Sequence, residues 1–234
     1  MIAAVAICAV AVIVLLAGEY RKHKLMRVIA KTIASLAFVV GAWSSSAFQD
    51  PSCDPVGWDD YSRIMLIGLV LRLAGDIALL GKSSRAFLVG LVAFLLGHIA
   101  YVVAFAQLAP PSTWLHPFAL APVIVGGIAL YLLWPRLGEM RLPVIIYVLA
   151  IVAMMAAAIA VARIPALPDH VRALIVIGAA LFFVSDLAVA RDKFVGASFT
   201  NRAWGLPTYY AGQLLIAWSI WPLFDGRCDI PWSP

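Results

Sequence analysis

Long apolar runs, separated by short polar stretches, fill almost the whole chain. Each run is close to the roughly 20 residues that a helix needs to cross a bilayer. The runs predict eight transmembrane helices, at about 2–18, 28–44, 61–80, 86–106, 117–134, 143–163, 170–190 and 207–224. Turn-forming residues fill the connections, so we expect one all-α integral-membrane domain over 1–234, without a separate soluble part.

The composition supports a polytopic membrane protein. Hydrophobic residues make up 64% of the chain and charged residues 12%, and the mean hydropathy is +0.99, well outside the balance of a soluble domain. No basic segment precedes the first run, and the basic cluster EYRKHKLMR follows it. We therefore expect the first run to be a transmembrane helix and not a cleaved signal peptide.

The basic residues divide unevenly between the two predicted sides of the membrane. If the cluster after the first helix is cytoplasmic, twelve fall inside and four outside, with Arg72 left within a helix. The twelve are Arg21, Lys22, Lys24, Arg27, Lys31, Lys82, Arg85, Arg136, Arg141, Arg191, Lys193 and Arg202, and the four are Arg63, Arg163, Arg172 and Arg227. The positive-inside rule then predicts that both termini lie outside, in the periplasm of a bacterial inner membrane. The net charge of +5 reflects this topology, and we expect no nucleic-acid partner.

The cysteines leave two alternatives open. Cys53 lies in the acidic loop FQDPSCDPVGWDD and Cys228 in the C-terminal tail, both predicted outside, whereas Cys8 lies in the first helix. A disulfide between Cys53 and Cys228 in an oxidising compartment and two free thiols are both compatible with the sequence.

Two carboxylates lie inside predicted membrane helices, Asp76 in GDIALL and Asp186 in LFFVSDLAVA. An aspartate at the centre of a membrane helix costs roughly 2.5 to 3.5 kcal/mol on insertion scales, so it usually has a function. Both helices run toward the cytoplasm, and each aspartate lies about four residues from the predicted helix end, or roughly 6 Å at 1.5 Å per residue. The matching depth predicts that the two carboxylates share one site.

Other polar side chains are predicted toward the same side of the membrane, with His98 and Tyr101 nearer the midplane, and form a pocket open to the cytoplasm. They are Lys31, Arg72, His98, Tyr101, Ser185, Tyr209, Tyr210 and Gln213. Structural alternatives exist for several of them: Arg72 pairing only with Asp76 one turn away, Lys31 reaching the membrane interface, or His98 as a buried core histidine. Tyr209 and Tyr210 could instead be aromatic residues of the membrane interface.

Several kinds of chemistry have no support in the sequence. No G-x-S-x-G elbow and no phosphate-binding glycine motif occurs. The four histidines, His23, His98, His116 and His170, fall at different predicted levels and cannot converge on one metal ion. We therefore expect no cofactor and no metal. The remaining chemistry is acid–base catalysis by the carboxylate pair.

Six segments together resemble one family. They are KTIASL, GDIALL, FLVGLVAFLLGHIAY, LPVIIYVLAIVAMM, GAALFFVSDLAVA and YYAGQLLIAWS, in that order along the chain. This series is similar to the YhhN family, the bacterial relatives of transmembrane protein 86. The resemblance implies lysoplasmalogenase activity, which hydrolyses the vinyl ether bond of a lysoplasmalogen to a fatty aldehyde and glycerophosphocholine or glycerophosphoethanolamine. The family's two essential aspartates map onto Asp76 and Asp186. The family usually has Lys-Pro where this chain has Lys31 and Thr32, which implies altered helix geometry there.

The predicted site suits this reaction on chemical grounds as well. Protonation of the β-carbon of a vinyl ether forms an oxocarbenium ion that water attacks, so one carboxylic acid and one carboxylate suffice. Because Arg72 would keep Asp76 ionised, we expect Asp186 to be the acid and Asp76 the base, although a close pair can exchange these roles. Lys31 is a candidate for the substrate phosphate, and Tyr210 and Gln213 are candidate hydrogen-bonding groups.

Two other functions remain open on the sequence alone. A proton-coupled lipid or small-solute transporter could carry protons on the same two aspartates. An intramembrane aspartyl protease also has two aspartates on two helices, but this chain lacks the Tyr-Asp and Gly-x-Gly-Asp contexts of those proteases. Head-group preference and oligomeric state are left open.

Overall fold

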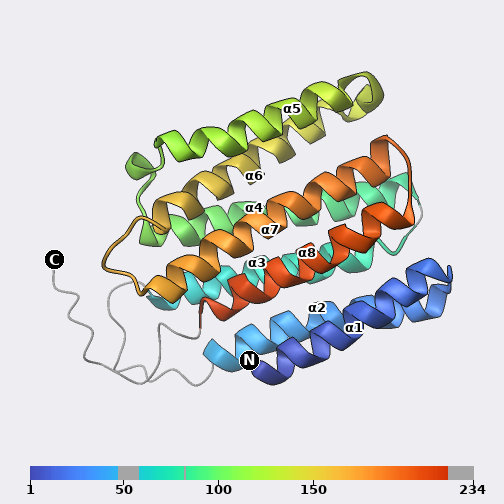
Figure 1. Ribbon diagram of the computed structural model, residues 1–234, viewed down its shortest axis with the longest axis horizontal. Helices are drawn as coiled ribbons and strands as arrows, with labels where there is room; N and C mark the ends of the chain where they lie inside the picture. Colours follow the sequence, from blue (N-terminus) through green and yellow to red (C-terminus); the bar gives the residue numbers. More distant parts are fainter. Residues whose placement is uncertain (47–57, 82, 221–234) are drawn as a thin grey trace.

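The computed structural model describes residues 1–46, 58–81 and 83–220, and within these ranges the chain is all helical (Figure 1). The α-helices are α1 Ile2–Tyr20, α2 Lys24–Ser46, α3 Trp58–Ala78, α4 Ser84–Leu108, α5 Leu120–Leu137, α6 Arg141–Val161, α7 Asp169–Phe194 and α8 Phe199–Trp218. Three short 3-10 helices, η2 Pro111–Thr113, η3 Pro117–Ala119 and η4 Gly138–Met140, flank α5. The all-α prediction is confirmed for the described ranges, and each expected helix has its counterpart.

Helix α8 differs most from the prediction of 207–224. It begins at Phe199, because the Ser198 hydroxyl accepts a hydrogen bond from the backbone N–H of Asn201 and caps the first turn. The first turns of α8 are polar, so hydropathy does not reveal them, and Pro207 lies inside the helix. The helix ends at Trp218, where the Ser219 N–H bonds back to Leu215 and Ile216 carbonyls.

Helix α7 is also longer than predicted and runs to Phe194, with Arg191 and Lys193 in its last turn. Basic side chains there interact favourably with the negative end of the helix dipole. Asp186 consequently lies two turns from the end of α7, whereas Asp76 lies in the last turn of α3. The predicted equal distance of both aspartates from their helix ends is wrong, because α7 extends past its apolar run.

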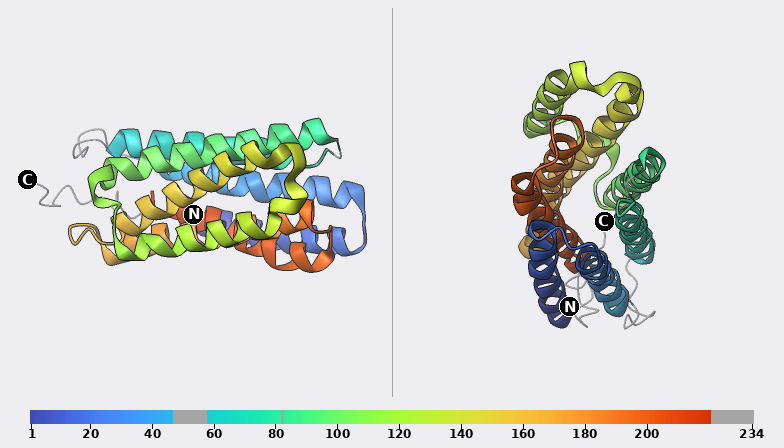
Figure 2. Two further views of the ribbon diagram at one scale, coloured as in Figure 1. Left: turned by 90° about the horizontal axis from the view of Figure 1, so that it is seen from above. Right: turned by 90° about the vertical axis from the view of Figure 1, so that its right-hand side faces the viewer.

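Successive helices alternate in direction and form hairpins (Figure 1). Figure 2 shows the α1–α2, α3–α4, α5–α6 and α7–α8 pairs lying side by side along one long axis. Helices α1, α3, α5 and α7 therefore finish at the same end of the bundle. We call this the basic end, because Arg21, Arg136, Arg191 and Lys193 lie there.

Five helical segments among the described residues are long and apolar enough to cross a membrane: Ile2–Tyr20, Lys24–Ser44, Ser84–Leu108, Pro117–Val161 and Asp169–Phe194. The fourth contains both α5 and α6. The outer surface carries large exposed apolar side chains, including Ile13, Val89, Ile128 and Leu149, as lipid contact requires. The helices are those of a polytopic membrane protein. Eight crossings and outside termini stay predictions, and Lys82, Arg227, Cys53 and Cys228 lie outside the described residues.

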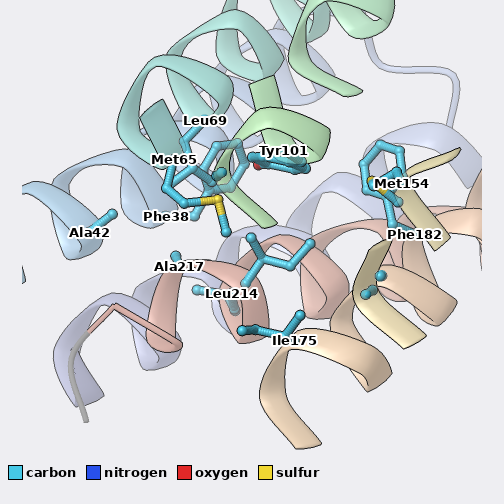
Figure 3. Packing of buried hydrophobic residues seen from close by; sticks show 14 of the residues in the cluster. Phe38, Ala42, Met65, Leu69, Tyr101, Met154, Ile175, Phe182, Leu214 and Ala217 are labelled. Atoms are coloured by element: carbon cyan, nitrogen blue, oxygen red, sulfur yellow. The ribbon is translucent and has the colours of Figure 1, made fainter. Parts of the chain in front are cut away.

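The core between the hairpins is built from large apolar side chains and closely packed small residues. Phe38, Met65, Tyr101, Phe182 and Ile175 are fully buried and come from four different helices (Figure 3). The thiol of Cys8 is also buried, on α1. This core holds the helices that carry the polar site in fixed relative positions.

Two glycines let α7 and α8 touch at backbone distance. A Cβ on Gly212 would lie 2.8 Å from the Gly178 carbonyl oxygen, and a Cβ on Gly178 would lie 3.1 Å from the Gly212 carbonyl oxygen. Backbone cannot give way as a side chain can, so any larger residue must push the helices apart.

Replacing Gly212 with alanine is therefore expected to destabilise the protein. Overpacking of this kind costs about 1 to 3 kcal/mol, or roughly 5 °C in the melting temperature in detergent. Gly127→Ala is the matched control, because nothing lies within 4 Å of a Cβ there. An unchanged melting temperature for Gly212→Ala would contradict the close contact of α7 and α8.

Candidate active site

A cavity of about 800 Å³ opens in the half of the bundle nearest the basic end. All eight α-helices contribute to its lining, and most of the lining residues come from the half of each helix toward that end. Apolar side chains of α4, α5 and α6, such as Leu91, Leu130 and Val148, line one side. Charged side chains of α1, α2, α7 and α8 line the other, so the cavity is amphipathic.

Asp76 lies in this cavity with three polar partners. Its Oδ1 is 3.1 Å from Lys31 Nζ. Its Oδ2 accepts hydrogen bonds from Ser35 Oγ at 2.7 Å and from Tyr209 Oη at 2.8 Å. The Asp76 side chain is only 4% exposed, so these partners replace the water that a carboxylate would otherwise need. Both oxygens of the Asp76 carboxyl group therefore have polar partners.

Asp186 lines the same cavity in a less polar environment. Its Oδ2 accepts a hydrogen bond from Tyr147 Oη at 2.9 Å and lies 3.4 Å from Nε2 of the buried His98. The rings of Tyr147 and Phe182 pack edge-on against the His98 imidazole, with centroids 5.0 Å apart in each pair. Asp186 has no lysine or arginine within ion-pair distance among the described residues, so the two carboxylates have unlike surroundings.

Arg72 does not make the predicted ion pair with Asp76, whose cation is Lys31. The fully buried guanidinium extends instead between aromatic rings, 4.1 Å from the Phe182 centroid, 5.2 Å from Tyr101 and 5.4 Å from Phe94. Gly97 leaves the space for it, since a Cβ there would lie 2.7 Å from Arg72 Nε. Its three nitrogens have no hydrogen-bond acceptor among the described residues, and the ring faces stabilise the charge.

The remaining predicted residues lie around this centre without contacting either carboxylate by a hydrogen bond. Tyr210 Oη is 3.3 Å from Ser35 Oγ and 3.4 Å from the Lys31 carbonyl oxygen. Tyr101 donates a hydrogen bond of 2.6 Å to Gln213 Oε1, away from the cavity lining. Ser185 donates to the Phe182 carbonyl of its own helix. Of the predicted set, Lys31, His98 and Tyr209 contact the aspartates directly.

Sequence reasoning missed two contacts, Ser35 and Tyr147. Ser35 lies one turn after Lys31 on α2, so helical spacing places both on one face. Tyr147 is the only side chain with a hydrogen-bonding group in α6 after its first residue, Arg141. A polar residue alone in an apolar membrane helix is itself a signal for a functional contact.

The described residues contain no group of three or more histidines, cysteines, aspartates or glutamates that could hold a metal ion. What the centre does offer is a carboxylate with an ammonium partner and a second carboxyl group with a phenol and an imidazole. Such an asymmetric pair can keep one carboxyl group ionised while the other carries a proton, which is the requirement for acid and base catalysis at neutral pH.

Comparison with known proteins identifies the family. The YhhN family model matches residues 26–220. The chain belongs to the YhhN family. A protein named uncharacterized membrane protein YhhN, from Escherichia coli O157:H7, is 26% identical over 210 residues, which are 87% of this chain and 91% of that protein. The apolar helices of this chain likewise require that it is an integral membrane protein.

Two mammalian proteins are also similar. The protein named lysoplasmalogenase TMEM86A from Bos taurus is 33% identical over 162 residues, and that from Homo sapiens is 32% identical over 161 residues. In both, the match covers 66% of this chain and 64% of the relative's length. No solved structure matches the chain.

Proposed function

We propose that this YhhN protein is a lysoplasmalogenase. The observation that carries the proposal is the pair of carboxyl groups with unlike partners, Asp76 and Asp186, lining one amphipathic cavity. The name of the mammalian relatives, lysoplasmalogenase, supports the same activity.

The lining sets how a single-chain lipid would lie. Its alkenyl chain occupies the apolar side formed by α4, α5 and α6, and its head group faces the charged side at the basic end. The vinyl ether bond then lies between Asp76 and Asp186. With the basic end toward the cytoplasm, as the positive-inside rule predicts, the head group belongs to the cytoplasmic leaflet.

Asp186 is the proposed acid and Asp76 the proposed base. Asp186 gives its proton to the β-carbon of the vinyl ether, which leaves a positive charge shared by the adjacent carbon and the ether oxygen. Asp76 stabilises this cation and accepts a proton from the water that attacks the carbon, which yields a hemiacetal. The hemiacetal collapses when Asp76 returns its proton to the ether oxygen and the hydroxyl proton goes to Asp186. Aldehyde and alcohol leave, and both carboxyl groups regain their starting states.

The buried cations have separate roles in this mechanism. Lys31 takes the role that was predicted for Arg72, because its ammonium group is the cation that contacts Asp76. It is consequently neutralised, and we do not assign it the substrate phosphate. Arg72 is a second buried positive charge, and it packs against the ring of Phe182, which lies four residues before Asp186 on α7.

The extent of the cavity agrees with the hydrolase proposal. A transporter needs both aspartates to reach each side of the membrane in turn. In this structure the lining of the cavity stops at mid-helix positions such as Ile151 and does not include the opposite ends of the helices. Access from one end suits a hydrolase that takes its substrate from one leaflet.

The activity itself is tested with purified protein in detergent. Aldehyde release should occur from choline and ethanolamine lysoplasmalogens, persist in excess chelator, and be absent with the saturated alkyl-ether analogue, which has no carbon to protonate. Folded protein that releases no aldehyde from either lysoplasmalogen would overturn the proposal.

Tyr147→Phe removes the hydrogen bond to Asp186 while keeping the ring in place. We expect kcat to fall about 10-fold to 100-fold, with little change in KM, because the phenol orients the proposed acid and does not bind lipid. Tyr131→Phe is the matched control, since Tyr131 is exposed on α5 and is absent from the cavity lining. Equal activity of the two variants would exclude this role of Tyr147.

A further inference from the structure

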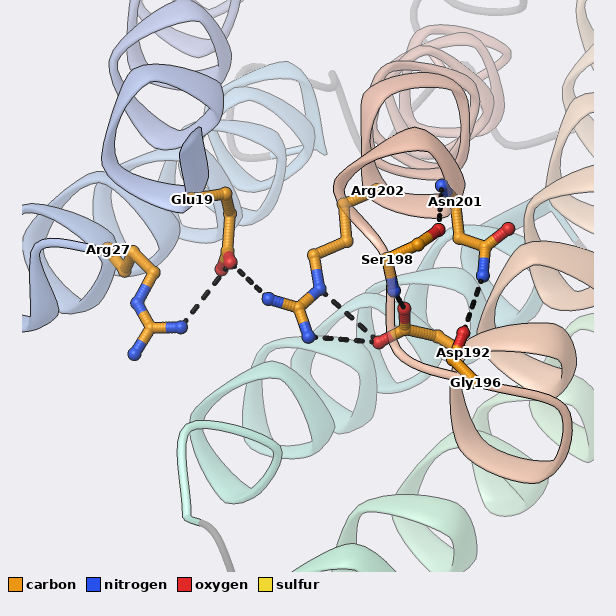
Figure 4. Close-up of polar contacts among 7 residues, drawn as sticks. All are labelled: Glu19, Arg27, Asp192, Gly196, Ser198, Asn201 and Arg202. Carbon is orange, nitrogen blue, oxygen red and sulfur yellow. Dashed lines mark hydrogen bonds and ion pairs between the residues drawn. The ribbon is translucent and has the colours of Figure 1, made fainter. Parts of the chain in front are cut away.

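The mouth of the cavity at the basic end contains a network of ion pairs that joins four helices (Figure 4). Glu19 at the end of α1 contacts both Arg27 of α2, at 3.3 Å, and Arg202 of α8, at 2.6 Å. Arg202 also contacts Asp192 of α7 at 3.1 Å. Asp192 in turn accepts a hydrogen bond from the Ser198 N–H. All four charged residues line the cavity, so the network frames its entrance.

The charges at the entrance do not cancel completely. Arg27 and Arg202 are balanced by Glu19 and Asp192, and Lys31 is balanced by Asp76 deeper in the cavity. Lys24 and Lys193 also line the cavity but form no ion pair with any residue that the structure describes. Lys193 Nζ lies 4.1 Å from the ring centroid of Phe87, which also lines the cavity and holds the ammonium group at the entrance.

The two unpaired lysines occupy equivalent positions relative to the reaction centre. Lys24 lies seven residues before Lys31 on α2, and Lys193 lies seven residues after Asp186 on α7. Seven residues are two helical turns, so each lysine lies about 10 Å nearer the basic end than the residue at the centre, on the same helix face. Each lysine therefore lies between the reaction centre and the basic end.

This spacing corresponds to the dimensions of a glycerophospholipid. Six bonds separate the vinyl carbon at the ether oxygen from the phosphorus atom. In a protein backbone, three bonds span the 3.80 Å between consecutive Cα atoms. Six bonds of an extended lipid backbone therefore span about 7 to 8 Å. With the vinyl ether between Asp76 and Asp186, the phosphate reaches the level of the two lysine ammonium groups, which can extend inward over part of the remaining distance.

We infer that Lys24 and Lys193 form a phosphate subsite at the cavity entrance, an inference that rests on the lysoplasmalogenase activity proposed above. The subsite selects a glycerophospholipid over an uncharged glycerol ether of the same chain. The choline or ethanolamine group projects beyond the lysines toward solvent, so it contributes little to the choice of substrate. Arg27 and Arg202 are already paired with Glu19 and Asp192 in the ion-pair network. The same network holds α2 and α7 on opposite sides of the phosphate.

The test measures binding and needs no turnover. Isothermal titration in detergent compares two saturated ether lipids that cannot be hydrolysed by this route, an alkylglycerophosphocholine and the matching alkylglycerol. Soluble glycerophosphocholine and inorganic phosphate serve as competitors, which separates a site for a lipid head group from a site for free phosphate. The variants are Lys24→Gln, Lys193→Gln and both together, with Arg21→Gln and Arg191→Gln as matched controls at exposed residues outside the cavity lining.

We expect wild type to bind the phosphate-bearing lipid more tightly than the alkylglycerol. Each lysine variant should weaken binding of the phosphate-bearing lipid about fivefold, the effect of one lysine near a charged head group. Binding of the alkylglycerol should not change, and Lys→Arg at either position should restore affinity. Glycerophosphocholine should compete better than inorganic phosphate, because only the former matches the spacing to the reaction centre.

The outcomes distinguish the subsite from the activity. Equal binding of both lipids by wild type, or a phosphate preference that survives in the double variant, would overturn the subsite and leave the hydrolase proposal standing. A lysine-dependent phosphate preference in a protein that releases no aldehyde would support the subsite and overturn the hydrolase proposal. Inorganic phosphate that competes as well as glycerophosphocholine would contradict recognition of a lipid head group.

Discussion

Asp186→Asn is expected to reduce kcat for lysoplasmalogen hydrolysis about 1,000-fold. Asparagine keeps the shape of the side chain and can still accept the hydrogen bond from Tyr147, but it has no proton to give to carbon. General acid catalysis contributes roughly 10² to 10⁴ in rate, and protonation of carbon is the difficult step in vinyl ether hydrolysis. Lipid binding should be unaffected, because Asp186 contacts the reacting atoms and not the head group.

The measurement is kcat for aldehyde release, together with the dissociation constant of the saturated alkyl-ether analogue. Asp169→Asn is the control, since Asp169 is exposed at the start of α7 and lies far from the cavity at the opposite end of the helix. More than about a tenth of wild-type activity in Asp186→Asn would show that another group supplies the proton, because the loss from a removed acid is roughly 10² or more.

Asp76→Asn is expected to abolish activity as well, and to destabilise the protein. The substitution removes the base and leaves the Lys31 ammonium group without its carboxylate, with only 13% of that side chain exposed. Breaking a buried pair by removing one partner costs about 3 to 5 kcal/mol, because an uncompensated charge remains. Loss of activity in this variant alone therefore could reflect poor folding.

A double variant separates the two effects. Lys31→Met combined with Asp76→Asn removes both charges and keeps similar side-chain volumes, so the melting temperature should return close to that of wild type. Aldehyde release should stay at background in the double variant, because neither base nor cation stabiliser is present. Recovery of activity along with stability would show that Asp76 acts only as a structural partner of Lys31.

Much of the helical architecture was predictable because a helix that crosses a membrane needs an apolar run of matching length. Apolar runs located all eight helices, but polar first turns hid the start of α8 at Phe199, where a serine cap and not apolarity sets the boundary. The same limitation applies to the end of α7, where Arg191 and Lys193 continue the helix beyond the apolar run. Capping and dipole effects decide helix ends, and hydropathy alone does not include them.

The two aspartates were predictable because buried carboxylates are expensive in a membrane, but their partners were not. Helical spacing placed Arg72 beside Asp76, yet the long side chain turns toward the rings of α4 and α7, and Lys31 from α2 takes its place. Which side chain reaches a carboxylate depends on how the helices pack, which no spacing along one helix can show. Tyr147 was missed for the same reason, since its partner is on another helix.

The most direct test of the central claim is the isotopic composition of the products formed by wild type in deuterated, ¹⁸O-labelled water. If Asp186 protonates the β-carbon and water attacks the neighbouring carbon, mass spectrometry will find one deuterium on the aldehyde carbon next to the carbonyl. The glycerophosphocholine will contain no ¹⁸O, because its oxygen never leaves the glycerol. Glycerophosphocholine that carries ¹⁸O, or aldehyde without carbon-bound deuterium, would contradict this mechanism.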